Sequence, residues 1–232
     1  FLREGRFQTA LIIGGAAAGV AVVIFITALV NGLQANTLKR VLGTQADIVI
    51  RPAEEVARPQ REPNPGEALL PRVEARAQRL RSIDQWQALD LALQKMPRIK
   101  AVSPMVSGPG FAVRADATKS IALFGVEPDR YNRIVAVDEK IVAGEYRVQA
   151  GEAVIGKDLA KDLGLSLGDR FRIVTAETDA PVSDTFTVMG IVDLGVRDLN
   201  RRTVFVTLRA AQTLLGLPGG ATQLDLKIED LF

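Results

Sequence analysis

One segment of the sequence has the spacing of a phosphate-binding loop. Gly151, Gly156 and Lys157 fit the pattern Gly-x-x-x-x-Gly-Lys, in which backbone amides and the lysine amine hold the phosphates of a nucleotide. Asp158 follows where the pattern needs a Ser or Thr hydroxyl for Mg²⁺, and its carboxylate would repel phosphate. Residues 153–155 are Ala-Val-Ile, which predicts a strand rather than an open loop. We therefore expect no ATP site in this chain.

The other reactive residues also predict no catalysis. The chain has no His and no Cys, which removes the commonest general base, the thiol nucleophile and the usual zinc ligands. Asp158 and Asp162 are four residues apart, but Lys157 and Lys161 lie beside them, so this pattern indicates an ion-paired helix surface. We predict no catalytic residue, no cofactor and no metal ligand. The net charge of +2, without a basic cluster interleaved with aromatics, predicts no nucleic-acid partner.

The chain is organised around an uncharged stretch near its N-terminus. No charged side chain occurs between Arg6 and Lys39, and residues 10–30 are apolar apart from Thr27 and a few glycines. At about 1.5 Å per residue, such a segment crosses the roughly 30 Å hydrocarbon core of a lipid bilayer, where a helix satisfies its own backbone. A signal peptide has a shorter apolar region and a cleavage site, and a buried soluble helix has a polar face. We predict a transmembrane helix.

Beyond the apolar run the helical pattern continues as an amphipathic stalk, which completes a first segment at 1–43. One face of the predicted stalk carries Val30, Leu33, Thr37, Leu38 and Val41. Because an apolar face must be covered, we predict that these residues contact a partner helix or a second subunit. In the membrane part, Gly15 and Gly19 form a Gly-x-x-x-Gly pair, which lets another helix approach closely. This pair is predicted to be a helix-packing site.

The remaining chain, about 190 residues, predicts an α+β fold. A capping box, Ser82-x-x-Gln85, starts a helix that Pro97 ends. A Gly-Pro turn is predicted at 107–110, with Met105 and Phe111 beside it. The other elements predicted in the first part are a strand at 46–51, a Pro- and Arg-rich loop at 52–81, and strands at 101–106, 111–114 and 120–126.

The second part begins at Glu127 and is richer in strands. A two-turn helix at 157–163 is predicted to end at Gly164, which suits a left-handed C′ position. Two β-α-β units, 47–106 and 203–229, flank a β-rich insertion at 127–198. The elements predicted after 127 are strands at 153–155, 170–175, 185–192, 203–207 and 223–229, and a helix at 209–215.

The order of these pieces resembles the MacB/FtsX-like superfamily of ABC transporter permeases, and the resemblance covers nearly all of the chain. It begins with the membrane helix that runs into Val30-Asn31-Gly32-Leu33. The further motifs that carry it are Val102-Ser103-Pro104, Leu123-Phe124-Gly125-Val126-Glu127-Pro128, Glu152-Ala-Val-Ile-Gly156, Leu163-Gly164-Leu165 with Gly168-Asp169, Val188-Met189-Gly190-Ile191-Val192, and Val204-Phe205-Val206 with Ala211-Gln212.

The resemblance implies an inner-membrane permease whose periplasmic domain lies between its first and second membrane helices. It implies a Porter-like part at 44–126 and 199–232, and a Sabre-like part inserted at 127–198. The implied partners are an ABC ATPase subunit, a second permease subunit in a homo- or heterodimer, and a periplasmic chaperone or adaptor protein. In the lipoprotein-releasing (LolC/LolE-type) branch, which we favour, Phe25 and Leu29 would line a cavity for acyl chains in the outer leaflet.

Two other functions remain open from the sequence. One is efflux of a drug, peptide or lipid by a MacB-like permease. The other is a membrane-tethered periplasmic sensor or binding domain without a transporter. Three further hydrophobic helices after Phe232 would indicate the permease, whereas a kinase or signalling module would indicate the sensor. A chain that begins with Phe1 rather than Met is typical of a fragment of a longer polypeptide.

Overall fold

The computed structural model describes residues 4–42, 45–53, 80–175 and 181–229, with the side chains of 11–33 in the first of these ranges. It divides the chain into two units, Phe1–Gln45 and Ala46–Phe232. The predicted loop at 52–81 falls mostly outside the described residues, as do the side chains of Thr37, Leu38 and Val41. On the predicted stalk face, the described side chains are those of Val30 and Leu33.

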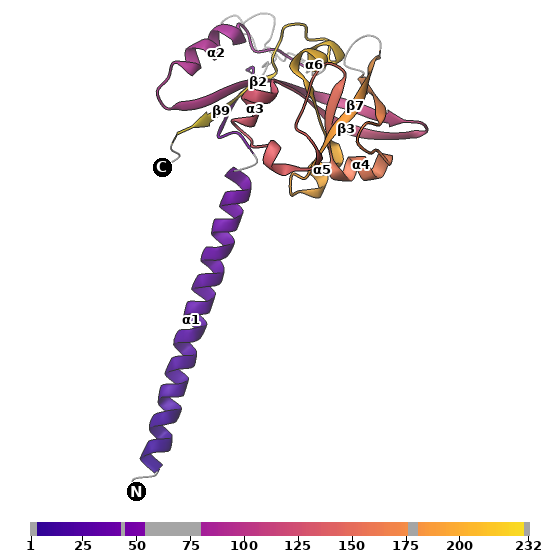
Figure 1. The fold of residues 1–232 in the computed structure, drawn as a ribbon. Coiled ribbons are helices and arrows are strands. Elements are labelled where there is room, and N and C mark those ends of the chain that lie inside the picture. Colours follow the sequence, from indigo (N-terminus) through magenta and orange to yellow (C-terminus); the bar gives the residue numbers. More distant parts are fainter. Residues whose placement is uncertain (1–3, 43–44, 54–79, 176–180, 230–232) are drawn as a thin grey trace, which may run out of the picture. The chain divides into compact units, whose positions relative to one another are not determined.

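The first unit consists of one long helix, α1, from Glu4 to Leu42 (Figure 1). Residues Leu11–Leu33 have a mean hydropathy of 2.5 and are long and apolar enough to cross a membrane. This segment is the one candidate span within the described ranges. Thr27 keeps the helix free of an unpaired hydroxyl, because its Oγ1 donates to the carbonyl of Val23 at 2.8 Å. The predicted long N-terminal helix is confirmed.

The second unit is built on a nine-stranded mixed sheet with short helices around it (Figure 1). The strand order is β1-β9-β2-β3-β8-β5-β7-β4, and β6 pairs with β2 and β7. The strands are β1 Ile48–Ile50, β2 Ile99–Arg114, β3 Ala117–Val126, β4 Ile141–Gly144, β5 Glu152–Gly156, β6 Arg170–Thr175, β7 Val182–Val192, β8 Thr203–Thr207 and β9 Gln223–Ile228. The helices are α2 Trp86–Gln94, α3 Pro128–Asn132, a 3₁₀ turn Asp138–Lys140, α4 Lys157–Leu163, α5 Arg197–Arg202 and α6 Leu208–Leu214.

The two predicted β-α-β units interleave in this sheet. β1 and β2 are joined through α2, and both pair antiparallel with β9, so β9 lies between them. β8 and β9 are joined through α6, and β8 pairs in parallel with β3. The first and last strands of the unit are therefore neighbours. The α+β fold predicted from the sequence is confirmed.

The β-rich insertion joins the same sheet rather than standing apart from it. Val154 and Ile155 of β5 pair antiparallel with β8, and residues 172–174 of β6 pair with the end of β2. Contacts therefore make Ala46–Phe232 one compact unit. The finer division into a Porter-like and a Sabre-like part stays a prediction.

Alternating side chains of the central strands fill the two faces of the sheet. In β8, Val204 and Val206 belong to the largest apolar cluster, which α4 and α6 cover, while Phe205 belongs to a second cluster that includes Tyr131 of α3. Gly125 permits the close approach of α6, because a Cβ there would lie 2.2 Å from the Cβ of Ala211. The core thus depends on backbone contact between α6 and β3.

The turn predicted at 107–110 is wrong. β2 continues through these residues, and the hairpin turns instead at Ala115, whose φ is 49°. Gly108 serves packing rather than turning, because a Cβ there would lie 2.7 Å from a methyl group of Leu215. Met105 is consequently buried in the core, and Phe111 is exposed on the long strand.

The capping box predicted at Ser82 is also wrong. Helix α2 begins at Trp86, after Gln85 in a left-handed conformation, and no side chain caps it. The Ser82 hydroxyl instead accepts a hydrogen bond from the backbone N–H of Ala221 at 3.0 Å. This contact ties the segment before α2 to the segment before β9. A long-range partner has replaced the local one that the sequence pattern indicated.

A buried carboxyl group in β9 makes the fold sensitive to pH. Asp225 is 3% exposed and lies opposite Val49 of β1 and Ser103 of β2. Burial raises the pKa of Asp225 to about 6, although a hydrogen bond from Gln223 and the charge of Arg51 act in the opposite direction. Ionised Asp225 is thus less favourable in the folded chain than in the unfolded chain.

We predict that Asp225→Asn stabilises the protein above pH 7, by about 2 kcal/mol. The folded pKa lies above the ordinary value of 3.8, so wild-type Asp225 costs stability above pH 6 and regains it as the pH falls toward 4. Urea unfolding of both proteins at pH 8 and pH 4 checks this. An Asn variant that is no more stable than the wild type at pH 8 would contradict the prediction.

Candidate functional site

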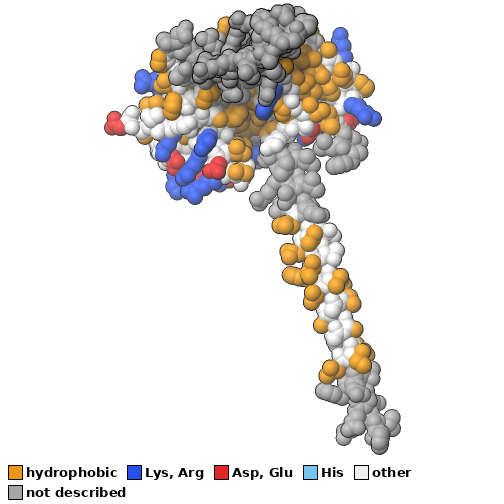
Figure 2. Space-filling model, turned by 180° about the vertical axis from the view of Figure 1, so that it is seen from behind, with side chains coloured by type: hydrophobic (Ala, Val, Ile, Leu, Met, Phe, Trp, Pro, Cys, Tyr) orange, Lys and Arg blue, Asp and Glu red, His pale blue; other side chains and the backbone are white. Residues whose placement is uncertain are grey.

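Helix α1 presents apolar side chains all around its described surface. Figure 2 shows hydrophobic side chains along this part of α1, with no Lys, Arg, Asp or Glu among them. Phe25 and Leu33 are each 67% exposed, and Leu29 and Val30 are also exposed. Such a surface is stable only in lipid or against other apolar helices.

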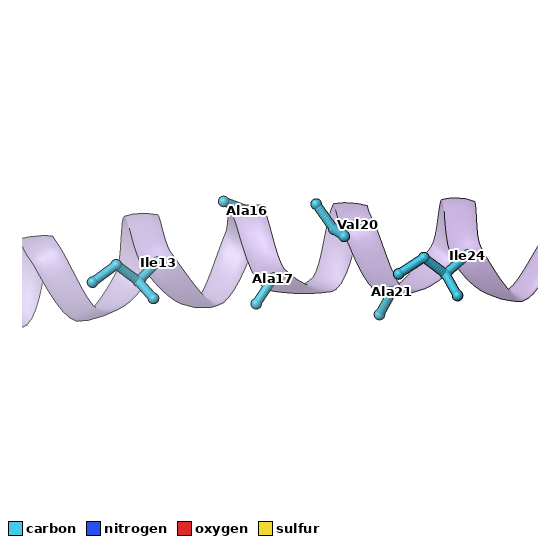
Figure 3. Close-up of a pocket in the computed structure, with 6 residues that line it drawn as sticks. All are labelled: Ile13, Ala16, Ala17, Val20, Ala21 and Ile24. Carbon is cyan, nitrogen blue, oxygen red and sulfur yellow. The ribbon is translucent and has the colours of Figure 1, made fainter.

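The membrane segment has two faces of different shape. A shallow apolar groove lies where alanines sit between branched side chains (Figure 3); it is lined by Ile13, Ala16, Ala17, Val20, Ala21 and Ile24. At 3.6 residues per turn, Gly15 and Gly19 lie on nearly the opposite side, which they share with Val30 and Leu33. A Cβ at either glycine would meet nothing within 4 Å. The sequence identified the glycine face but not the groove.

The segment that resembles a phosphate loop is a strand followed by a helix. Glu152–Gly156 forms β5, with Ala153, Val154 and Ile155 fully buried. Gly156 faces α5, because a Cβ there would lie 2.1 Å from the carbonyl oxygen of Asn200. The Lys157 amine pairs with Asp193, whose pKa falls to about 2 through hydrogen bonds from Lys157, Gly195 and Asn200. The predicted strand at 153–155 is confirmed, and it leaves no open loop for phosphates.

Of the two acidic residues that the sequence singled out, Asp162 forms ion pairs, whereas Asp158 Oδ2 is buried without a hydrogen-bond partner among the described residues. The predicted pairing with Lys157 or Lys161 is not found for either in this part of the chain, and Lys157 pairs with Asp193 instead. Asp162 lies 3.5 Å from Arg201 and 3.9 Å from Lys119. Within the described ranges, no three Asp, Glu, His or Cys groups are arranged to hold a metal ion.

The first residues of the core are held by a buried ionic contact, which we call the Asp47 clasp. Asp47 Oδ1 accepts from the Lys227 amine at 2.9 Å, and Oδ2 accepts from the backbone N–H of Ile228 at 3.0 Å. The Asp47 backbone N–H also donates to the carbonyl of Leu226 at 3.0 Å. The Asp47 side chain is 1% exposed. The chain is thereby fixed to β9 immediately before β1 begins.

A second buried contact, centred on Arg130, joins α3 to α2. Within the described sheet, β3 pairs with β2 only as far as Met105, so the earlier part of β2 has a free edge there. Arg130 covers this edge: its Nε donates to the Val102 carbonyl at 3.0 Å, and its Nη2 lies 2.5 Å from Asp90 Oδ1 in α2. The sequence reasoning missed this contact, because forty positions separate the two residues and neither stands in a motif.

A mixed polar and apolar groove lies beside Arg130, where the parallel strands β3 and β8 end. Helices α3 and α6 leave these strand ends and pack in different apolar clusters. Trp86 lines the groove and is only half-buried, with its indole N–H donating to the carbonyl of Gly219 at 2.8 Å. Its lining includes Trp86, Gln87, Glu127, Asp129, Arg130, Arg133, Arg209 and Gln212. The open ends of parallel strands commonly form such crevices.

One family of known proteins matches both units of the chain. The profile of a family described as the MacB-like periplasmic core domain matches residues 9–230. The chain belongs to this family. The match includes most of α1 as well as the whole described core, so the helix and the sheet are parts of one family arrangement.

Among curated proteins, the lipoprotein-releasing system transmembrane protein LolE of Haemophilus influenzae is 25% identical over 227 residues, covering 94% of this chain and 49% of the relative. LolC of Neisseria meningitidis, with the same system name, is 25% identical over 154 residues, covering 62% of this chain and 37% of the relative. The chain thus spans half or less of the length of these relatives.

Two solved structures are also similar to this chain. The extracellular domain of the noncanonic ABC-type transporter YknZ from Gram-positive bacteria has a TM-score of 0.46 and 17% identity, covering 61% of this chain and 72% of its own. The periplasmic region of MacB from Actinobacillus actinomycetemcomitans has a TM-score of 0.45 and 15% identity, covering 63% and 65%.

Membership of the MacB-like family fixes the side of the membrane on which the core lies. The family domain is periplasmic, and α1 carries the candidate span Leu11–Leu33. The chain is therefore located at the inner membrane, with its core in the periplasm. The localisation predicted from the sequence is confirmed.

We predict that Arg130→Ala destabilises this MacB-like core by about 2 kcal/mol or more, because it leaves the Asp90 carboxylate buried without its cation. Asp90 is 9% exposed at its side chain and Arg130 is 23% exposed, so the pair is only partly screened by water. Denaturant unfolding measures the effect. The matched control is Lys119→Ala, which removes an exposed partner of Asp162 and should cost less than about 1 kcal/mol. Equal effects of the two substitutions would contradict a special role for Arg130.

Proposed function

We propose that this chain is the membrane-anchored core of an ABC transporter permease that releases lipoproteins from the inner membrane. The observation that carries the proposal is the family match over residues 9–230, which includes the membrane helix together with the core. The names of the LolE and LolC relatives support lipoproteins as the substrate class. In this proposal an ABC ATPase subunit supplies the energy, and a second permease subunit completes the assembly.

The residues of this chain would then bind and transmit rather than catalyse. Lys157 is the residue that the sequence pattern places where it could bind phosphate. It stands at the start of α4, and its amine forms an ion pair with Asp193. ATP hydrolysis would therefore take place on the partner subunit. Motion of that subunit would reach the core through α1, and the core would move the substrate or pass it to a periplasmic chaperone or adaptor.

The two faces of α1 would have different partners in this assembly. The face with Gly15, Gly19, Val30 and Leu33 would pack against membrane helices of the same permease or of its dimer partner. By helical spacing, Phe25 and Leu29 lie between the two faces, where they would line an acyl-chain cavity in the outer leaflet. Of the predicted contact residues, Thr37 and Val41 would continue the first face beyond the membrane, whereas 3.6 residues per turn put Leu38 nearer the groove side.

Purification of the full-length protein from membranes tests the proposal directly. We expect an ABC ATPase subunit to copurify, and the reconstituted complex to release a fluorescent lipoprotein from proteoliposomes only with ATP. Copurification with a signalling kinase, or a complex that exports drugs but retains lipoproteins, would contradict the proposed function.

We predict that Leu33→Glu uncouples ATP hydrolysis from release, because a carboxylate on the packing face prevents close helix contact. Hydrolysis should change less than about twofold, while release falls by about tenfold or more, as the loss of about 1.4 kcal/mol of coupling would require. The matched control is Leu91→Glu, at an exposed position of α2. Normal release by the Leu33 variant, once its presence in the membrane is established, would show that the stalk assignment is wrong.

A further inference from the structure

The chain enters and leaves its core on two neighbouring strands. β1 is the first strand of the core and β9 is the last, and they pair antiparallel with Ile48 opposite Leu226. The start of β1 therefore lies beside the end of β9. Asp47 stands at this point, five residues after α1 ends at Leu42. A displacement of α1 that is passed along the covalent chain enters the core at this point.

β1 alone is poorly suited to transmit such a displacement. It has three residues, it forms one edge of the sheet, and Ile48 and Val49 are 44% and 41% exposed. A short edge strand that is pulled from one end loses its hydrogen bonds one after another. β9 differs, because it lies between β1 and β2 and pairs with β2 from Gln223 to Ile228. A pull delivered to β9 would be shared by these ladder bonds.

The Asp47 clasp connects the incoming chain to β9 before β1 begins. Both carboxylate oxygens are occupied, one by the Lys227 amine and the other by the N–H of Ile228. The Asp47 side chain is 1% exposed and that of Lys227 is 24% exposed, so water competes weakly for the contact. Hydrogen bonds to a charged group are stronger than neutral ones, and these two precede the three pairs of β1 in the chain.

We infer that the Asp47 clasp is the joint through which motion of α1 is passed to β9 and so to the rest of the sheet. Asp47 and Lys227 are positioning residues in this inference: they touch no substrate, and they keep the incoming and outgoing ends of the core together. The inference rests on the proposed function for its purpose, but the rigidity of the joint can be measured without it.

The first test measures the joint itself in the full-length protein. Residues 1–232 contain no Cys, so once any Cys elsewhere in the full-length protein is replaced by Ser, Gln45→Cys and Glu229→Cys introduce a defined pair of spin labels at two exposed positions beside the clasp. We expect a narrow distance distribution in the wild-type background, and a distribution at least twice as broad with Asp47→Ala. Asp162→Ala, which removes another carboxylate that meets two cations, should leave the distribution narrow. A narrow distribution in the Asp47 variant would overturn the inference.

The second test measures coupling in the full-length permease reconstituted with the ATPase that copurifies with it. We expect Asp47→Ala to lower the lipoprotein released per ATP hydrolysed by about tenfold or more, because it removes both hydrogen bonds of the carboxylate and the loss of one charge-assisted bond already corresponds to about tenfold. Asp47→Asn keeps an acceptor for Ile228 but loses the charge, so it should fall between the wild type and Asp47→Ala. Unfolding curves of the variants identify any that fail to fold.

A disulfide distinguishes a joint from a purely structural contact. Ile48→Cys with Leu226→Cys places two thiols on directly opposed residues, where strand spacing permits a disulfide. In the Asp47→Ala background, oxidation should restore coupling and reduction should abolish it again. Coupling that stays low with the disulfide formed would overturn the inference. If the wild type itself shows no ATP-dependent release, the proposed function fails, while the spin-label result still decides whether the clasp holds the two ends together.

Discussion

The structure depends on the need to remove the surface of Leu11–Leu33 from water. The segment has no charged residue and exposes large apolar side chains on every side, at a cost of about 25 cal/mol for each Å² left in water. A bilayer covers this surface, and helical hydrogen bonding satisfies its backbone there. The core is consequently attached to a membrane through its first residues, and its function has to be compatible with that attachment.

The positions of the first and last strands in the sheet make the core suited to attachment at its first residues. β9 is the last strand in the sequence, but in the sheet it lies between β1 and β2. The start of β1, where the core is attached to α1, therefore lies beside the end of β9. Asp47 fixes one to the other, and Arg130 joins α2 and α3 across the free edge of β2. Close approach of helices to strands at Gly125 and Gly156 makes the rest of the core compact. These contacts suit a domain that moves as a body.

Local sequence patterns predicted the elements whose contacts are also local. The strands at 170–175 and 203–207 and the helix at 157–163 coincide with those in the structure, and Gly164 has the left-handed φ of 63° that its place after the helix suggested. Each depends on the alternation or the helical period of nearby side chains, together with a terminating glycine. The long apolar helix was predictable for the same reason.

Features set by distant residues could not be predicted in this way. Gly108 and Pro109 look like a turn, but the side chain of Leu215 occupies the space that a Cβ of Gly108 would need, and β2 continues. Ser82 and Gln85 have the spacing of a capping box, but the Ser82 hydroxyl accepts a hydrogen bond from the backbone N–H of Ala221 instead. The partners in the Asp47 clasp are 180 positions apart. Only the folded sheet brings these groups together, and no periodicity in one segment encodes the other.

Topology labelling in cells tests whether α1 spans the inner membrane with the core on the periplasmic side. Single cysteines at Val20 in the span and at Leu91 in α2 can be introduced into the full-length protein and exposed to a membrane-impermeant maleimide after the outer membrane is permeabilised. We expect the cysteine at Leu91 to be labelled with the inner membrane intact, and the cysteine at Val20 to stay unlabelled until detergent dissolves the bilayer. Labelling at Leu91 only after rupture of the inner membrane, or labelling at Val20 in intact membranes, would contradict this topology.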